Sequence, residues 1–221
     1  MNTENEAPAP MNVPTVSKKR TGNHVMESDQ LMEMLRPGRE FELKVQSLLK
    51  ALPMGTANLL IIPLKDYSMM ARALISYYSQ EKMPGVYVTV NKPYADVLKL
   101  VSSLSTNVKF IDAITALTGK GTEDNAIVTY LDSPLALVEI NLAISDMLKE
   151  VVSNQKFFIL DSISTLLVYN SPSSVEKFCH TVIVKNRNEN VVSLFLMIES
   201  EEHHSVVETL SQFVDNVRTI R

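Results

Sequence analysis

Two kinds of apolar pattern alternate along the chain. Short continuous runs of apolar residues are typical of strands buried on both faces, and an apolar residue every three or four positions is typical of amphipathic helices. The clearest continuous runs are 57–62 (ANLLII), 85–90 (GVYVTV), 156–160 (KFFIL) and 191–198 (VVSLFLMI). Strands of this kind, separated by helices, predict an α/β fold: a three-layer α/β/α sandwich with a mainly parallel sheet.

Weaker patterns complete the expected order of elements. Three further strands are expected at 108–111, 127–131 and 216–220, and a loop is expected at 118–125. The expected helices cover 38–51, 67–78, 93–104 and 133–152, with two more beginning near Ser173 and Ser205.

Three of these helices have more detailed expectations. The fourth is expected to be the longest, with Leu135, Val138 and Leu142 on its apolar face. The patterns Ser173–Glu176 and Ser205–Glu208 have the spacing of capping boxes, which predicts the starts of the last two helices.

The first 28 residues differ in composition from the rest. They contain Pro8, Pro10 and Pro14 and few large apolar side chains, so burial cannot offset the entropy lost on ordering. We therefore predict a disordered N-terminal arm over 1–28 and one α/β domain over 29–221.

Charge and cysteine content narrow the function classes. The net charge of −4 gives no basic footprint, so nucleic acid is not an expected partner. The single Cys179 excludes an intramolecular disulfide, and its place in a helical apolar stripe predicts packing.

The longest mostly apolar stretch, 157–169, is too short and too polar to span a bilayer, and the N-terminus lacks the pattern of a signal peptide. A cytoplasmic location without membrane insertion is therefore expected.

The turn after the first strand lacks the residues of a phosphate-binding loop. A strand, a turn, a helix and a parallel strand form the unit that carries G-x-x-x-x-G-K-[ST] in nucleotide-binding α/β proteins. No glycine occurs between Gly55 and Gly85. The residues at the turn are Pro63, Leu64, Lys65, Asp66, Tyr67, Ser68, Met69 and Met70. The strand and helix pattern of a nucleotide-binding domain is therefore present, but the glycine-rich phosphate-binding loop is not.

Asp161 directly follows four apolar strand residues and has two interpretations. An acid at this place holds magnesium in nucleotidases of this class, and an Asp before Ser-Ile-Ser also fits a cap of the following turn. Because no phosphate loop stands opposite, we favour the cap.

The segments NLLIIP, GVYVTVNKPYADVL, VKFIDA, KFFILDSISTLL, SLFLMIES and VRTIR together resemble the RecA-like ATPase family, most closely its KaiC-like branch. The similarity covers about residues 40–221, and its most specific fragment is 160–167 (LDSISTLL). The resemblance implies a RecA-like sheet, a Walker B-like position at Asp161 and Ser162, and a role in signal transduction, a setting common in archaeal cells. It also implies association through domain faces, with nucleotide held between subunits.

The phosphate loop departs from the family at each of its defining positions. Pro63 and Ser68 replace the two glycines, Met69 replaces the lysine and Met70 replaces the hydroxyl residue. Without glycine the backbone cannot wrap closely around phosphate, and without lysine its counter-charge is missing.

The family's paired catalytic acids are also replaced. They correspond to Asn91 and Lys92, neither of which takes a proton from water near neutral pH. Phosphate loop and catalytic acids are lost together, which is the pattern of a pseudoenzyme without catalytic residues or a cofactor.

Two other motifs are assigned to loops. Residues 119–122 (GKGT) resemble the end of a phosphate loop, but the acids that follow would repel an anion, so a mobile loop is expected. His203 and His204 are adjacent and have no distant set of partner ligands, so a polar loop is expected there instead of a metal site.

The leading functional hypothesis is a non-catalytic, KaiC-like regulatory or scaffolding domain that binds a protein partner or forms a homo-oligomer. A second is an ATP-binding enzyme in which Asp161 holds magnesium and Lys65 or a neighbouring subunit supplies positive charge. A third is a small-molecule sensor that uses the vacated cleft at the carboxyl ends of the strands. Its apolar lining would come from Tyr67, Met69, Met70 and Tyr94, which also fit ordinary packing between helix and sheet.

Overall fold

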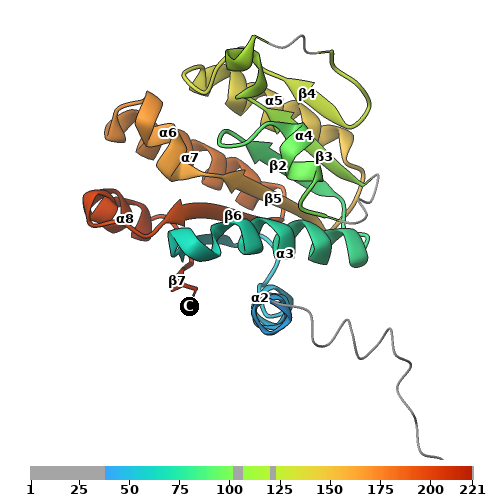
Figure 1. Ribbon diagram of the computed structural model, residues 1–221, viewed down its shortest axis with the longest axis vertical. Coiled ribbons are helices and arrows are strands. Elements are labelled where there is room, and N and C mark those ends of the chain that lie inside the picture. The colour runs from blue at the N-terminus through green and yellow to red at the C-terminus, as the bar shows by residue number, and fades with distance from the viewer. Residues whose placement is uncertain (1–37, 102–106, 120–122, 221) are drawn as a thin grey trace, which may run out of the picture. The chain divides into compact units, whose positions relative to one another are not determined.

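One sheet of seven parallel strands forms the centre of the domain, in the order β4-β3-β2-β5-β6-β1-β7 (Figure 1). The computed structural model describes residues 38–101, 107–119 and 123–220. Within them the strands are β1 Ala57–Ile62, β2 Gly85–Thr89, β3 Val108–Asp112, β4 Val128–Tyr130, β5 Lys156–Asp161, β6 Val191–Ile198 and β7 Asn216–Thr219.

Helices cover both faces of the sheet (Figure 1). One face is packed against α2 Arg39–Lys50, α3 Tyr67–Gln80 and the short α4 Tyr94–Leu98. The other is packed against α5 Leu137–Glu150, α6 Ile163–Tyr169, α7 Pro172–Asn188 and α8 His204–Ser211. Three short 3₁₀ turns complete the described elements: η1 Leu64–Asp66, η2 Thr115–Thr118 and η3 Glu201–His203.

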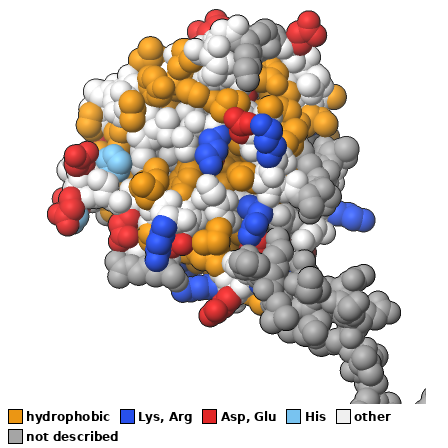
Figure 2. Space-filling model, viewed as in Figure 1, with side chains coloured by type: hydrophobic (Ala, Val, Ile, Leu, Met, Phe, Trp, Pro, Cys, Tyr) orange, Lys and Arg blue, Asp and Glu red, His pale blue; other side chains and the backbone are white. Residues whose placement is uncertain are grey.

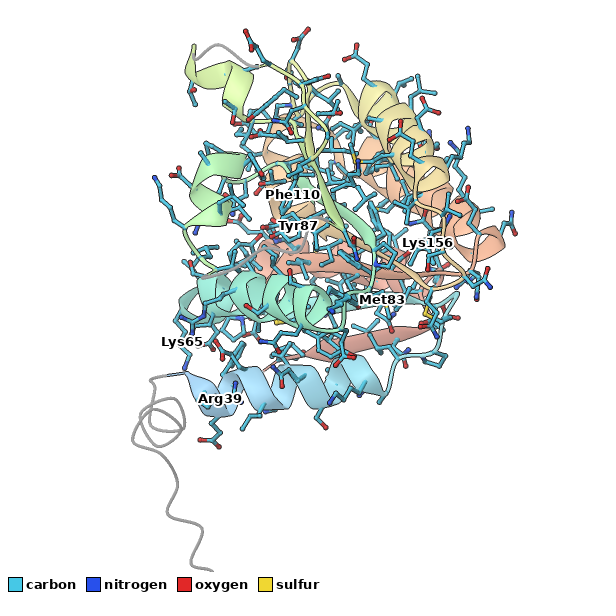
Figure 3. All side chains as sticks on the ribbon, turned by 90° about the vertical axis from the view of Figure 1, so that its right-hand side faces the viewer. Arg39, Lys65, Met83, Tyr87, Phe110 and Lys156 are labelled. Carbon is cyan, nitrogen blue, oxygen red and sulfur yellow. The ribbon has the colours of Figure 1, made fainter. Side chains whose placement is uncertain are left out.

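The side chains of each inner strand alternate between two separate apolar clusters. On β2, Val86 and Val88 pack with α5 and α7, whereas Tyr87 packs on the face covered by α3. Figure 3 shows Tyr87 and Phe110 in the interior, with Arg39 and Lys65 at the surface. This two-sided burial is why the inner strands read as continuous apolar runs, and it confirms the predicted α/β/α layers with a parallel sheet.

The fourth helix differs from the prediction. α5 begins at Leu137, after a turn in which the backbone N–H of Ala136 donates to the carbonyl of Ser133 (3.2 Å). It has 14 residues, whereas α7 has 17, so it is not the longest described helix. Its predicted apolar face is also wrong: Leu135, Val138 and Leu142 are exposed. The buried residues of α5 are Ile140, Ile144, Met147 and Leu148.

Both predicted capping boxes are wrong. The N-cap of α7 is Ser171, whose hydroxyl accepts from the N–H of Ser174, because Pro172 takes the first helical position that suits its fixed φ. α8 is entered directly from η3, and the capping hydroxyl there is that of Ser200, which accepts from the N–H of Glu202. The apolar stripe predicted for α7 is confirmed, including the complete burial of Cys179.

Some expectations fall outside the described residues. They are the disordered arm at 1–28, positions 102–104 of the helix expected at 93–104, and most of the loop at 119–122. The described part of that expected helix is shorter than predicted, since α4 ends at Leu98. The described residues all belong to one compact unit.

Candidate functional site

The turn after β1 is a short 3₁₀ turn that leads directly into α3. Pro63 precedes η1, in which the N–H of Asp66 donates to the carbonyl of Pro63 (2.9 Å), and α3 begins at the next residue, Tyr67. The backbone thus passes from strand to helix within four residues. A loop that directs several N–H groups towards one phosphate has no room in this segment.

The eight residues of this turn divide between surface and core. Leu64, Lys65 and Ser68 are exposed, and Pro63, Asp66 and Met69 are half-buried. Tyr67 and Met70 are buried in the apolar cluster under α3. Their burial supports the packing interpretation over the lining of a sensor cleft. Tyr94 packs its ring on Phe110, with 4.9 Å between centroids, which also fits packing.

Asp161 is buried at the end of β5, on the face of the sheet that α3 covers. Its Oδ2 accepts a short hydrogen bond from the hydroxyl of Tyr87 on the neighbouring strand β2. Its Oδ1 has no hydrogen-bond partner among the described residues, and the side chain is 1% exposed. The carboxyl group is therefore enclosed by the core and held from one side only.

Burial changes the acidity of this carboxyl group. Loss of water around the charged form raises the pKa of Asp161 from 3.8 to about 7. A large part of the Asp161 population thus holds a proton at neutral pH. A magnesium ligand needs an ionised oxygen that the ion can reach, and Asp161 meets neither condition fully.

The cap that we expected from Asp161 is made by its neighbour. Ser162 is the N-cap of α6, and its hydroxyl accepts from the N–H of Thr165 (3.4 Å). The favoured interpretation of Asp161 as a cap is therefore wrong. The reason is the alternation of strand side chains: Asp161 is still part of β5 and points into the layer under α3.

Lys92, which the resemblance aligns with one of the family's catalytic acids, has a side chain that reaches the turn after β1. Its Nζ donates to the hydroxyl of Ser68 at the first turn of α3 (3.1 Å). Its backbone N–H donates to the hydroxyl of Thr89 (3.3 Å), which fixes the bend after β2. Asn91 and Lys92 are both half-buried. The structure thus brings Lys92 to Ser68, whereas Lys65 is exposed on η1 (Figure 3).

Asp112, at the end of β3, is a strand-end acid that the sequence reasoning did not single out. It is fully buried, and its carboxylate accepts from the N–H groups of Tyr94 (2.7 Å), Ile114 (2.9 Å) and Thr115 (2.9 Å) and from the hydroxyl of Thr115. The segment VKFIDA shows the same signal as KFFILD, an apolar strand that ends in Asp. Asp112 therefore accepts hydrogen bonds from the turn that follows it, which Asp161 does not.

A cavity of about 670 Å³ lies beside the carboxyl ends of β6 and β1. Its polar lining includes Glu199, Glu201, His203 and His204. Nδ1 of His203 lies 3.4 Å from the carbonyl of Ile198. The two histidines are not in the expected loop: His203 ends η3 and His204 is the first residue of α8. Among the described residues, no group of three His, Cys, Asp or Glu side chains is placed to hold a metal ion. The acids give this cavity a negative lining, which disfavours phosphate.

The surface carries charges of both signs. On the face shown in Figure 2, Lys and Arg side chains are interspersed with Asp and Glu and separated by hydrophobic side chains. Within the part of the chain that the structure describes, no helix is long and apolar enough to cross a bilayer.

Comparison with protein-family profiles identifies a family. The sequence profile of a protein family, described as "Family of unknown function (DUF7504)", matches residues 69–220. The match begins inside α3, so β1 and most of the turn after it precede the matched segment. Among curated proteins the chain has no match.

Proposed function

The chain belongs to the DUF7504 family of unknown function, and from the geometry at the carboxyl ends of its strands we propose that it is a non-catalytic, RecA-like domain of the KaiC-like type. Such a domain acts by binding other protein chains, as a regulatory or scaffolding component of signal transduction. The observation that carries this proposal is the closed turn between β1 and α3.

Mg-ATP does not fit the residues present. Its phosphates require converging backbone N–H groups and a lysine. The turn instead forms the 3₁₀ turn η1, followed by Tyr67 with its ring buried in the core. Its magnesium requires an accessible carboxylate, and Asp161 is enclosed with Tyr87. The neighbouring cavity is lined with acids. We therefore derive no hydrolytic step for this domain.

The sheet is compatible with the RecA-like part of the proposal. All seven strands are parallel, and β6 lies between β1, which precedes the degenerate loop, and β5, which ends in Asp161. The fragment LDSISTLL, on which the resemblance mainly depends, forms the end of β5 and most of α6. The strand order supports the RecA-like part of the proposal, and the position of LDSISTLL supports the KaiC-like part through the resemblance.

One observation favours the second candidate, an ATP-binding domain with an unconventional loop. Nζ of Lys92 lies at the first turn of α3, 3.1 Å from Ser68 Oγ. A cation at that place is near the position where a phosphate would meet the start of a helix. In this candidate Lys92, and not Lys65, supplies the missing positive charge.

Thermal unfolding with nucleotide separates the two candidates. A ligand at 100 times its Kd stabilises the folded state by about 2.7 kcal/mol, which gives a readily measured rise in Tm. We expect no change in Tm with millimolar Mg-ATP, with magnesium alone or with ATP and a chelator. A rise that requires magnesium and disappears in Lys92→Ala would reject the non-catalytic proposal and support the second candidate. Lys65→Ala is the matched control, because Lys65 is the exposed lysine of the same turn.

A further inference from the structure

α5 has apolar residues on two opposite sides. One side is buried against the sheet by Ile140, Ile144 and Leu148. On the other side Val138 and Leu142, four residues apart and so on one helix face, are 75% and 56% exposed. Leu135, in the turn before the helix, continues this ridge and is 59% exposed. A surface helix normally presents polar residues on its outer face, so this ridge requires an explanation.

A groove of about 480 Å³ lies directly beside this ridge, between α5 and α7. Leu135, Leu137 and Val138 line it from α5 and the preceding turn, and Phe178 and Lys177 line it from α7. The ridge and the groove share Leu135 and Val138. One surface therefore contains a protruding apolar element and a recess next to it.

Polar contacts fix the shape of this groove. Nζ of Lys185 on α7 donates to Asn141 Oδ1 and Ser145 Oγ on α5, both at 3.1 Å. Nδ2 of Asn170, between α6 and α7, donates to the carbonyl of Pro134 (3.0 Å). The spacing of α5 and α7 is thus set within the domain, and a partner would meet a preformed surface.

The groove carries one charge of each sign on its two walls. Glu139 on α5 and Lys177 on α7 both line it, and both are exposed. Within the described residues neither of them forms an ion pair with the other or with a third residue. A complementary partner surface would have an apolar ridge to fill the groove, a base to face Glu139 and an acid to face Lys177. This surface itself has all three, so it is complementary to a second copy of itself.

We propose that a second copy of this chain binds this surface in a two-fold symmetric dimer. In such a dimer the same patch serves both copies, so the ridge of each enters the groove of the other. An antiparallel approach of the two α5 helices brings Leu135 of one copy towards Leu142 of the other, with Val138 near the axis. Glu139 of each copy then faces Lys177 of the other, which gives two reciprocal ion pairs. This interface goes beyond the proposed function, since it involves neither the turn after β1 nor a nucleotide.

Sedimentation equilibrium of the full chain, over about 1 to 100 μM, tests the dimer. We expect a concentration-dependent dimer whose Kd rises at least tenfold in Val138→Glu, because this change places a charge in the apolar contact. Val138 is exposed within one copy, so the variant should keep the Tm of the parent at concentrations where both are monomers. Val152→Glu is the matched control: Val152 is 98% exposed and lies beyond the C-terminal end of α5, whose last residue, Glu150, is about 18 Å along the helix axis from Val138. It should leave the Kd unchanged.

A charge exchange tests the two-fold geometry. Glu139→Lys alone should weaken the dimer, and adding Lys177→Glu should restore it, since both reciprocal pairs are then rebuilt with opposite sign. A monomeric parent at all concentrations would overturn the proposal. So would equal weakening by Val138→Glu and Val152→Glu, or a double variant no tighter than Glu139→Lys. A monomer that binds a hydrophobic dye, with binding lost in Val138→Glu, would also overturn it and would assign the surface to a different apolar partner.

Discussion

Asp112 and Asp161 each end a buried strand, but their carboxyl groups have different surroundings. Asp112 accepts from three backbone N–H groups and a hydroxyl, whereas Asp161 accepts from the Tyr87 hydroxyl and has an unpartnered Oδ1. In sequence the two are alike, since both follow apolar strands. The difference arises from the segment after each strand. After β3, the N–H groups of Ile114 and Thr115 turn back towards the Asp112 carboxylate. After β5, the helix α6 has Ser162 as its N-cap, so no N–H group of the described residues turns back to Asp161.

Removing the carboxylate of Asp112 should destabilise the domain strongly. Asp112→Ala leaves three N–H groups, one buried and two partly buried, without their acceptor, and we expect a loss of about 3 kcal/mol or more. Asp112→Asn keeps one acceptor oxygen and should lose about half as much. Urea unfolding measures both. The control is Asp146→Ala, where the carboxylate forms an exposed pair with Lys149 (3.4 Å) and should change stability by less than about 0.5 kcal/mol.

Asp161 should make stability fall as pH rises from about 4 to 7. Its pKa is about 7 in the folded state and 3.8 for an exposed aspartate, so the folded state holds the proton longer than the unfolded chain does. Stability therefore decreases with pH across this window, by on the order of 4 kcal/mol, and is level above it. Asp161→Asn removes this dependence. The stability of the Asn variant relative to the parent should thus increase from pH 4 to pH 7 in urea unfolding, and a constant difference would contradict the buried, protonated carboxyl.

At the scale of elements, apolar patterns predicted the strands well and the helix starts less well. The run ANLLII coincides with β1, because a strand buried on both faces excludes polar residues over its whole length. The start of α8 was misplaced, because Ser205 and Glu208 have capping spacing while the chain is already helical from η3. The α5 error has another origin: its two apolar sides are indistinguishable in sequence, and only the packing shows which one faces the sheet.

The contact between β2 and β5 depends on the absence of a side chain at Gly85. A Cβ there would lie 2.3 Å from the carbonyl oxygen of Phe157 and 2.4 Å from its ring. That ring stacks on Tyr78, at 4.0 Å between centroids, and cannot move aside easily. We expect Gly85→Ala to cost about 3 kcal/mol or more in urea unfolding, because the backbone of two paired strands must separate.

Gly119→Ala is the control for this change. No atom of the described residues lies within 4 Å of a Cβ at Gly119, so among them only its left-handed backbone (φ +71°) opposes the substitution. A loss of about 1 kcal/mol is expected there. Equal effects at the two glycines would show that backbone conformation, and not the close approach to Phe157, limits Gly85.

At the scale of the whole molecule, the candidate site depends on strand order, which residue patterns do not give. The sequence predicted that Asp161 ends a strand, but not that Tyr87 lies on the adjacent strand with its hydroxyl on the carboxyl group. The sequence did show that the turn lacks the glycines of a phosphate loop, because residue identities are read directly from it. It did not predict that Lys92, just after β2, reaches Ser68, since that contact requires the two bends to meet at one edge of the sheet.

Strand order also predicts which fragments fold. β1 has β6 and β7 as its two neighbours, and both follow α7 in the chain. A fragment of residues 1–190 keeps five strands but leaves β1 without any partner. We expect it to lack the cooperative thermal unfolding of the full chain, measured by circular dichroism. Cooperative unfolding of this fragment would show that four strands and their helices suffice as a folding unit.

The pairing of β1 has a consequence for synthesis in the cell. Asn58 bonds to Ser193, 135 residues later, and Ala57 bonds to Asp215, 158 residues later. The ribosome adds about 5 to 20 residues per second, so β1 leaves the exit tunnel many seconds before its neighbours exist. During that interval an apolar, unpaired strand is a target for chaperones and for aggregation. The yield of folded protein should therefore depend on how well the nascent chain is protected, as much as on the stability of the finished sheet.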